Sequence, residues 1–147
     1  MRVVIQRSLN STVTVNNEIV GSIDHGLVVL VGFTCGDSLT DIDYIINKLI
    51  HLRIFDDEND VMNKSLLDTK GSILSISQFT LYADTRKGRR PSYVEALEPI
   101  KARELYDLFN QKLLELGINV QCGIFGADMK VNINNDGPVT IVMESRN

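Results

Sequence analysis

The sequence has few of the residues on which most enzyme active sites depend. Among its 147 residues are two histidines, His25 and His51, and no tryptophan. Neither histidine belongs to a recognisable motif of nucleophile and base, and no Cys/His cluster has the spacing of a zinc site. The chain also lacks a Walker loop and a dinucleotide-binding fingerprint. We therefore expect no metal and no cofactor; in any enzyme built this way, backbone groups or the substrate itself do much of the chemistry.

Long apolar runs and numerous cysteines are also missing. No segment approaches the roughly 20 apolar residues that cross a bilayer. Gln6 and Arg7 interrupt the first apolar stretch too early for a signal peptide. The two cysteines, Cys35 and Cys122, are typical of free thiols in a reducing compartment rather than of a disulfide. We expect a cytoplasmic protein without a membrane partner.

The net charge of −4 argues against a protein that coats nucleic acid through bulk attraction. Any contact with nucleic acid must be local, and one segment places four cations within five residues: Arg86, Lys87, Arg89 and Arg90. Charge alone leaves two alternatives open, a phosphate-binding loop and a solvated loop. The acidic run 56–60 lacks the ligand spacing and central glycine of an EF-hand, so we interpret it as a surface turn.

The residue pattern predicts a single α+β domain over residues 1–147. We expect a β-rich, barrel-like or curved sheet, antiparallel or mixed, with two helices packed on it. Turn residues and apolar alternation predict strands over residues 2–7, 12–15, 19–23, 27–33, 73–76, 119–125, 129–134 and 139–144, the first four as a β-meander.

Both expected helices have identifiable ends. Ser38 or Thr40 caps the first, and Pro99 and Gly117 bracket the second. Apolar residues recur at helical spacing in each. In the first helix these are Leu39, Ile42, Ile45, Ile46, Leu49 and Ile50. In the second they are Ile100, Leu105, Leu108, Phe109, Leu113 and Leu116.

The segment Ser77-Gln78-Phe79-Thr80 follows the expected buried strand 73–76 and is the candidate site. On a continuous strand Ser77 and Thr80 would face opposite sides, so the strand must bend or end between them to bring both hydroxyls to one substrate. Leaving the strand here would free the N–H groups of Gln78, Phe79 and Thr80 from ladder pairing. Free, aimed N–H groups are what an oxyanion site requires. The alternative is that the hydroxyls merely satisfy a strand end.

Two stretches, Ser77-Gln78-Phe79-Thr80-Leu81-Tyr82-Ala83-Asp84 and Gly137-Pro138-Val139-Thr140, resemble the signature motifs of the D-aminoacyl-tRNA deacylases. The two stretches lie about sixty residues apart in a chain of family length. The likeness covers the whole chain. It includes residues 4–7, 26–32, 87–92 and 123–127. The departures are Ser8 and Ser11, where a more apolar and a smaller residue are expected.

The resemblance implies a cytosolic homodimer that hydrolyses the ester between a D-amino acid, or glycine, and the terminal adenosine of tRNA. Its site would lie at the subunit interface. The wall that holds the adenosine and the ester carbonyl would be Ser77, Gln78, Phe79 and Thr80. Gly137 and Pro138 match a segment that enters the partner's pocket through a cis peptide bond and excludes L-amino acids, and Arg7 matches a residue that supports it.

Three attacking groups stay open: the Thr80 hydroxyl, water and the adenosine 2′-hydroxyl. The shortage of bases favours assistance by the substrate. Two other functions also stay open, a non-catalytic homodimer that binds the tRNA end and a small-ester or amide hydrolase unrelated to RNA. The cation cluster argues against the second, because a small neutral ester has no need of it. We predict that the loop Arg86–Arg90 contacts phosphate of an aminoacyl-tRNA.

Overall fold

Two very long strands form the centre of the fold in the computed structural model, which describes residues 1–146. Strands β1 (Arg2–Val15) and β2 (Glu18–Gly32) form an antiparallel hairpin whose turn residues, Asn16 and Asn17, have positive φ. Three further strands complete a mixed sheet of order β6-β5-β2-β1-β7: β5 (Ser72–Ser77), β6 (Val120–Cys122) and β7 (Lys130–Glu144). β5 runs parallel to both β2 and β6, whereas β7 is antiparallel to β1.

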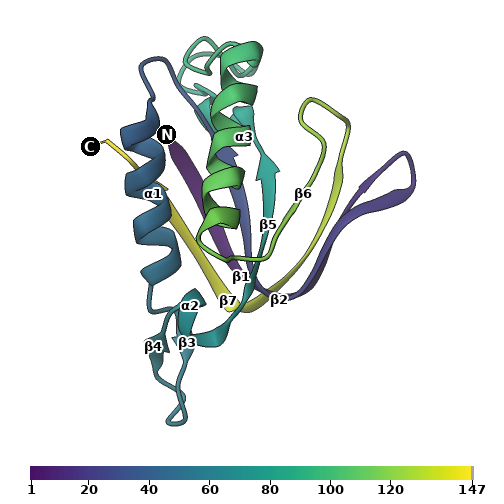
Figure 1. Ribbon diagram of the computed structural model, residues 1–147. Coiled ribbons are helices and arrows are strands. Elements are labelled where there is room, and N and C mark those ends of the chain that lie inside the picture. The colour runs from purple at the N-terminus through teal and green to yellow at the C-terminus, as the bar shows by residue number, and fades with distance from the viewer. Residues whose placement is uncertain (147) are drawn as a thin grey trace.

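The two main helices, α1 (Leu39–His51) and α3 (Pro99–Glu115), lie side by side over one face of the sheet (Figure 1). Each belongs to a connection between parallel strands, which needs a crossover long enough to return to the same end of the sheet. The first connection also carries three short elements: β3 (Phe55–Asp56), β4 (Met62–Lys64) and the one-turn helix α2 (Leu66–Thr69). A short 3₁₀ turn, η1 (Phe79–Tyr82), follows β5.

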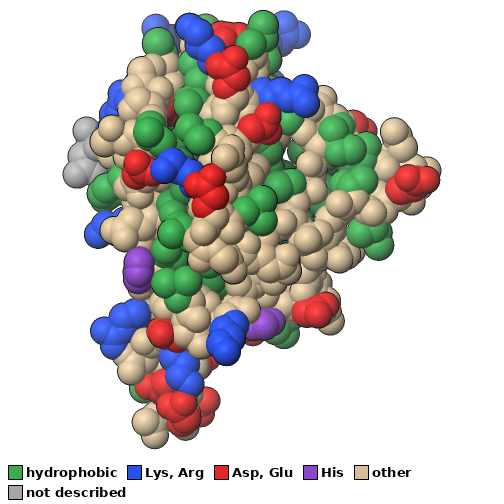
Figure 2. Space-filling view, viewed as in Figure 1, with side chains coloured by type: hydrophobic (Ala, Val, Ile, Leu, Met, Phe, Trp, Pro, Cys, Tyr) green, Lys and Arg blue, Asp and Glu red, His purple; other side chains and the backbone are tan. Residues whose placement is uncertain are grey.

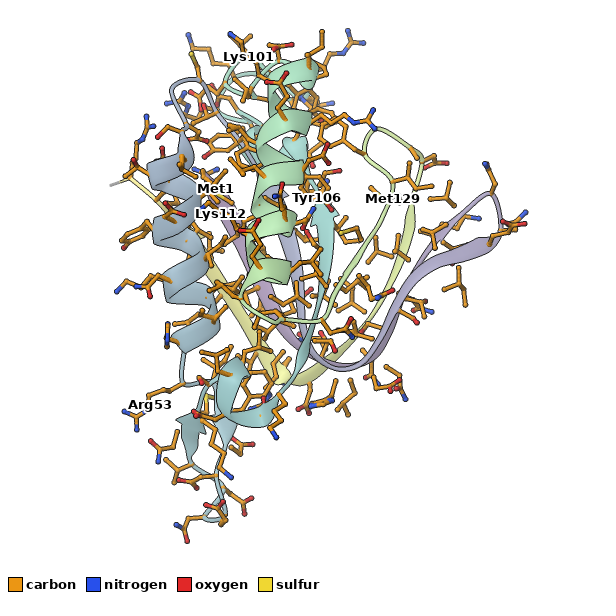
Figure 3. All side chains as sticks on the ribbon, in the orientation of Figure 1. Met1, Arg53, Lys101, Tyr106, Lys112 and Met129 are labelled. Carbon is orange, nitrogen blue, oxygen red and sulfur yellow. The ribbon has the colours of Figure 1, made fainter. Side chains whose placement is uncertain are left out.

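The apolar side chains of both helices form the main core against β1 and β2. Ile42, Ile45 and Leu49 of α1 are fully buried there, as are Phe109 and Leu113 of α3. The Asp41 carboxylate accepts the N–H of Ser38 at 2.8 Å at the start of α1, and Glu98 caps α3 in front of Pro99. Figure 3 shows Tyr106 between α3 and β5, where its hydroxyl donates to the Ser75 carbonyl at 2.8 Å.

The long strands continue past the helices and bend away from them as an arm (Figure 1). A second, smaller core fills the inside of this bend, with Val13, Ile23 and Val28 packed against Leu74 and Ile76 of β5. On the outer side of β5, β6 pairs only with Ile73–Ser75. The edge of β5 therefore lies open from Ile76 onward, between α3 and the arm.

The expected α+β class and the curved, mixed sheet are confirmed, and the sheet of residues 1–146 is open rather than a closed barrel. The four-stranded meander is wrong: residues 2–15 and 18–32 are two continuous strands with a register shift after Val13. Residues 130–144 are likewise one strand that contains a bulge. Polar residues within these strands do not end them, because β1 is hydrogen-bonded to β2 on one side and to β7 on the other.

The predicted helices are confirmed, including the cap at Ser38 and the end near Gly117, but a third, α2, was not expected. The inner stripe of α3 is wrong at both ends, because Ile100 and Leu116 are 73% and 54% exposed. Ala102 and Tyr106 lie on the buried side instead. Among residues 1–146, no helix is both long and apolar enough to cross a membrane. Cys35 is an exposed free thiol and Cys122 a half-buried one.

The burial along α3 leads to a stability prediction. Phe109→Ala should lower the free energy of unfolding by about 3–5 kcal/mol, because it leaves a cavity under a fully buried ring. Ile100→Ala, on the same helix but exposed, should cost less than about 0.5 kcal/mol. Denaturant unfolding of the two variants measures the difference. Equal losses would mean that the helix packs through a different face.

Candidate functional site

The hydrogen-bond ladder of β5 ends one residue after the strand, and two main-chain donors follow it. The N–H of Gln78 donates to the Val31 carbonyl at 2.7 Å, so it is still paired with β2. The chain then curls into η1, and no acceptor within residues 1–146 receives the N–H of Phe79 or Thr80. Two of the three expected free donors, on Phe79 and Thr80, are therefore present. The prediction of a free donor on Gln78 is wrong. Adjacent free N–H groups are suited to a developing oxyanion.

The Thr80 hydroxyl has a hydrogen-bond partner but no base beside it. Its oxygen accepts the side-chain amide of Gln78. The one carboxylate that lines the adjoining cavity among the described residues belongs to Glu98, whose two oxygens accept the N–H groups of Ile100 and Lys101 at 3.0 and 2.9 Å. His25 and His51 contact main-chain carbonyls elsewhere. A hydroxyl without a base is a weak nucleophile.

Close packing from below holds η1 in place. A Cβ atom on Gly32 of β2 would lie 2.9 Å from the Gln78 carbonyl oxygen and 3.1 Å from Cβ of Leu81. Only glycine therefore lets η1 sit this close to the sheet.

Arg2 and Tyr82 hold the other end of η1. The Arg2 guanidinium donates to the Leu81 carbonyl, pairs with Glu144 at 2.7 Å and lies 4.8 Å from the centre of the Tyr82 ring. Burial raises the pKa of the Tyr82 hydroxyl to about 12, so this ring stays neutral. The far end of η1 is thus tied to β1 and, through Glu144, to β7.

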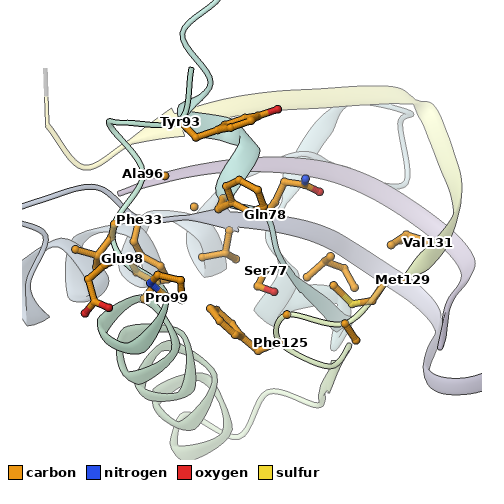
Figure 4. A pocket seen from close by; sticks show the side chains of 18 residues that line it. Phe33, Ser77, Gln78, Tyr93, Ala96, Glu98, Pro99, Phe125, Met129 and Val131 are labelled. Atoms are coloured by element: carbon orange, nitrogen blue, oxygen red, sulfur yellow. The ribbon is translucent and has the colours of Figure 1, made fainter. Parts of the chain in front are cut away.

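A cavity of about 570 Å³ opens at the free edge of β5. It lies between the start of α3, the turn before β7 and the first residues of β7, and its lining is mostly apolar. Figure 4 shows Ser77 and Phe125 in its interior and Tyr93 at its rim. The residues that define it include Phe33, Ser77, Tyr93, Phe125, Met129 and Val131. Its size and lining are typical of a small-molecule site.

The second candidate segment, Gly137-Pro138, projects from the sheet in a wide bulge. Gln6 pairs with Thr140 and Ser8 with Asn135, so four residues of β7, 136–139, stand opposite one residue of β1. The Asn135 side chain stabilises the bulge by donating to the main-chain carbonyls of Arg7 and Val139, both at 3.0 Å. The Gly137–Pro138 peptide bond is cis, as the resemblance implies, and both residues are exposed.

Arg7 supports this bulge from a buried position. It is 7% exposed, donates to the Ile54 carbonyl at 2.9 Å, and forms ion pairs with Asp56 and Asp136 at 3.3 and 3.1 Å. The Nε–H does not point at Asp136, so that contact is an ion pair without a hydrogen bond. Gly137 has a φ of +118°, and a Cβ there would lie 3.0 Å from an Arg7 nitrogen. A side chain at position 137 would therefore displace the support.

Within one chain the two segments do not meet. Ser77 pairs with Val31, whose partner on β1 is Val3, whereas the bulge stands opposite Arg7. Three strand spacings across the sheet and four residues along β1 separate them by roughly 20 Å. Figure 1 shows that β5 ends at the top of the sheet, while β7 bends at the bottom. The cavity is therefore built without Gly137, Pro138 or Arg7.

The basic loop lies beside the cavity, on the stretch that leads from η1 to the rim residue Tyr93. Asp84 and Ser92 close its base through two main-chain hydrogen bonds of 2.8 and 2.9 Å. Hydrogen bonds from Arg86 lower the pKa of Asp84 to about 2, so this pair holds at any pH above about 4. Arg86 is thus paired locally, whereas Lys87, Arg89 and Arg90 take part in no ion pair of the described chain.

Several lining residues carried no signal in the sequence. Phe33, Met129 and Val131 look like ordinary strand residues, and only the topology brings them to the edge of β5. Phe125 lies in a stretch that supports the family resemblance, and Tyr93 directly follows the basic loop. An aromatic residue next to a cation cluster was the one signal that could have identified Tyr93.

Comparisons with known proteins give a consistent result. A family model described as D-Tyr-tRNA(Tyr) deacylase matches residues 4–144. The chain is 56% identical over 146 residues to the D-aminoacyl-tRNA deacylase of Geobacillus sp. (strain WCH70), covering 99% of this chain and 96% of that one. It is 52% identical over 145 residues to that of Thermus aquaticus, covering 99% and 95%.

Two solved structures share the fold. One, described as c-Myc DNA unwinding element binding protein, has a TM-score of 0.92 at 36% identity and covers 98% of both chains. The other, a probable eukaryotic D-amino acid tRNA deacylase, has a TM-score of 0.83 at 21% identity, over 97% of this chain and 98% of that one. The second likeness, at this low identity, concerns the fold alone.

The free donors of η1 can be tested without any substrate. The amides of Phe79 and Thr80 should exchange with solvent deuterium at least about 100-fold faster than that of Gln78, which is paired within the sheet. Residue-resolved exchange by NMR measures all three. Comparable protection of Phe79, Thr80 and Gln78 would show that η1 has acceptors in solution and that no free donor pair exists.

Proposed function

The chain belongs to the D-Tyr-tRNA(Tyr) deacylase family, whose members are ester hydrolases, and we propose that it releases D-amino acids and glycine from the terminal adenosine of tRNA while rejecting L-aminoacyl-tRNA. The observation that carries this proposal is the pair of free N–H groups on Phe79 and Thr80 beside a cavity of nucleoside size. An ester carbonyl held there would gain both donors as its oxygen becomes negative.

In the proposed reaction the adenosine occupies the cavity, and Ser77 contacts it from the wall. A water molecule attacks the ester carbonyl, its oxygen forms the new bond to carbon, and the bond from carbon to the 3′-oxygen breaks. The neighbouring 2′-hydroxyl of the substrate orients this water, accepts a proton from it and donates its own proton to the leaving 3′-oxygen, so the 2′-hydroxyl is regenerated. The products are the free amino acid and a tRNA with a free 3′-hydroxyl. No protein base is needed, which fits a cavity whose lining carboxylate, Glu98, is occupied as a helix cap.

Chiral selection is assigned to the backbone of Gly137 and Pro138. L- and D-amino acids carry the same side chains, so a shaped side-chain pocket cannot separate them for every amino acid. A wall of main chain can, because it fills the space on the L side of the Cα atom whatever the side chain is. Glycine has no side chain on either side and should pass. The exposed bulge that carries Gly137, held by Arg7 and Asn135, supports this role.

A second copy of the chain would complete the site. The cavity and the bulge lie far apart in one chain, so the proposed wall must come from a partner. The sheet face away from α1 and α3 offers a surface for such a partner: Leu30, Val4 and Val142 are neighbours on β2, β1 and β7 there, and Val142 is 61% exposed. Apolar side chains in a row on a sheet face that no helix of residues 1–146 covers favour association.

The direct experiment incubates the purified protein with D-Tyr-tRNA, Gly-tRNA and L-Tyr-tRNA and follows release of the amino acid. We expect rapid release from the first two and none above the spontaneous rate from the third. Binding of D-Tyr-tRNA without release would instead identify a protein that only binds the tRNA end. Release from L-Tyr-tRNA at a comparable rate would contradict the assignment of chiral selection.

The proposed mechanism makes Thr80 dispensable as a nucleophile. Thr80→Ala removes a hydroxyl that has no base to activate it but keeps the main-chain donor, so kcat should fall by roughly tenfold or less. A substrate that lacks the terminal 2′-hydroxyl should react at least about 100-fold more slowly with the unaltered protein. Single-turnover rates measure both effects. A covalent acyl group trapped on Thr80 would refute this mechanism.

The free cations of the basic loop should act through phosphate. Replacing Arg89 and Arg90 by Ala should weaken tRNA binding and reduce the slope of log affinity against log salt by about 1 to 2. A variant with Lys48→Ala and Lys112→Ala has the same net charge but changes α1 and α3, away from the loop. Its salt slope should match the unaltered protein. An unchanged slope in the Arg89/Arg90 variant would show that these side chains do not contact phosphate and that the loop is only a solvated surface loop.

Gly32 should matter for rate rather than for stability alone. Gly32→Ala pushes η1 and its two donors off their positions, and we expect kcat to fall roughly tenfold or more. Gly21→Ala is the matched control on the same strand. A Cβ there would lie 2.9 Å from the Cys122 carbonyl oxygen, an equally tight contact far from η1. Both variants should lose similar stability. If kcat falls equally in both, the position of η1 does not control the reaction.

A further inference from the structure

Two aromatic rings stand exposed at the rim of the cavity. Phe79 is 57% exposed and Tyr93 is 41% exposed, and both also line the cavity. Their ring centres lie 5.1 Å apart in an edge-to-face contact, so each ring steadies the other. Figure 4 shows the Tyr93 ring across the rim, outside the interior that Ser77 and Phe125 define. The proposed reaction at the donors of η1 makes no use of the Tyr93 ring.

The segment that carries Tyr93 is fastened to the end of β2. The N–H of Leu97 donates to the Phe33 carbonyl at 2.9 Å, and Thr34 pairs with Ala96 in an isolated bridge. The N–H of Ala96 donates back to the Tyr93 carbonyl at 3.0 Å, which closes a turn directly behind the ring. The Tyr93 ring therefore stands on a fixed base rather than on a mobile loop.

Cations without ion-pair partners in the described chain lie on the loop that leads to Tyr93. Lys87, Arg89 and Arg90 are exposed and make no ion pair within residues 1–146, while Arg86 is taken up by Asp84. Figure 2 shows Lys and Arg side chains among apolar ones at the end of the molecule where α3 begins. The chain as a whole has a net charge of −4, so the positive charge beside the exposed rings is confined to this loop.

We infer that Tyr93, braced by Phe79, is a stacking platform for the unpaired nucleotide that directly precedes the terminal adenosine, and that Lys87, Arg89 and Arg90 hold the phosphates on its path. The ligand class is single-stranded nucleic acid, because aromatic faces combined with cations recognise stacked bases and backbone together. This inference rests on the proposed function, since the adenosine in the cavity sets where the preceding nucleotide leaves it.

The chemistry of the platform fits a shared RNA end. Stacking on a ring tolerates any base, and phosphate contacts carry no sequence information. Every tRNA ends in the same unpaired nucleotides, so such a subsite would add affinity for all of them. It would also favour an amino acid attached to RNA over one attached to a free nucleoside. A double-stranded stem, whose bases are already stacked, has no face to offer the ring.

The test is a double-mutant cycle between the ring and the base. The substrates are D-Tyr esterified to adenosine, to the trinucleotide CCA, and to a CCA whose middle nucleotide has no base. The enzymes are the unaltered protein, Tyr93→Ala and Tyr93→Phe. For the unaltered protein we expect kcat/KM to be between roughly fivefold and 100-fold higher for CCA than for the abasic form. Tyr93→Ala should remove most of this difference, and Tyr93→Phe should keep it.

A matched control is Tyr44→Ala, which removes a ring of similar exposure, 46%, from α1 and should leave the difference between the CCA and abasic substrates intact. Equal loss by Tyr93→Ala on all three substrates would overturn the inference, because it would show that the ring contacts the terminal adenosine and not the nucleotide before it. An abasic substrate as good as CCA with the unaltered protein would overturn it without any variant. If the unaltered protein hydrolyses none of the D-Tyr esters and not D-Tyr-tRNA either, the proposed function itself fails.

Discussion

The structure depends on where one hydrogen-bond ladder stops. Gln78 makes the last pairing with β2, and the short strand β6 leaves the outer edge of β5 open just before it. The chain turns into η1 at that point, which leaves two adjacent donors unpaired beside a cavity. A main-chain N–H group that is removed from water without an acceptor lowers the stability of the fold, and a bound ligand that accepts the hydrogen bond removes this cost. Gly32 beneath the turn and Arg2 at its end keep them fixed in place.

The bulge of β7 is a second interruption of the same sheet, stabilised by different means. Asn135 and buried Arg7 replace the missing ladder contacts there and hold Gly137 and Pro138 out toward solvent. Each interruption is held by several contacts, and the two lie at opposite ends of the sheet. In the proposed function they serve one reaction across two copies of the chain, which associate through the apolar row on the sheet face that no helix of the described chain covers.

Much of this could be predicted from local sequence, and the remainder depends on topology. The helix cap at Ser38 and the end of β5 follow from short-range patterns and are confirmed. The pairing of Gln78 was missed because it depends on which strand lies beside β5. The sequence predicts two strands, 2–7 and 12–15, where the structure has one long β1. Ser8 and Ser11 between them are buried in the strand, and each hydroxyl donates to a main-chain carbonyl, at 2.9 and 2.7 Å. Cavity residues contributed by distant strands had no local signal at all.

The central claim is that one chain supplies the donors of η1 and its partner supplies the wall, and subunit mixing tests this most directly. Gly32→Ala damages the first half. Gly137→Val damages the second, because a valine side chain would push against Arg7 and Val139 and enlarge the proposed wall into the space of the substrate, so this variant alone should be nearly inactive on D-Tyr-tRNA. In a randomly mixed population half of the dimers combine the two variants, and each has one intact site, so activity on D-Tyr-tRNA should recover to about a quarter of the unaltered level. Activity that stays at the mean of the two variants after complete exchange would contradict a shared site.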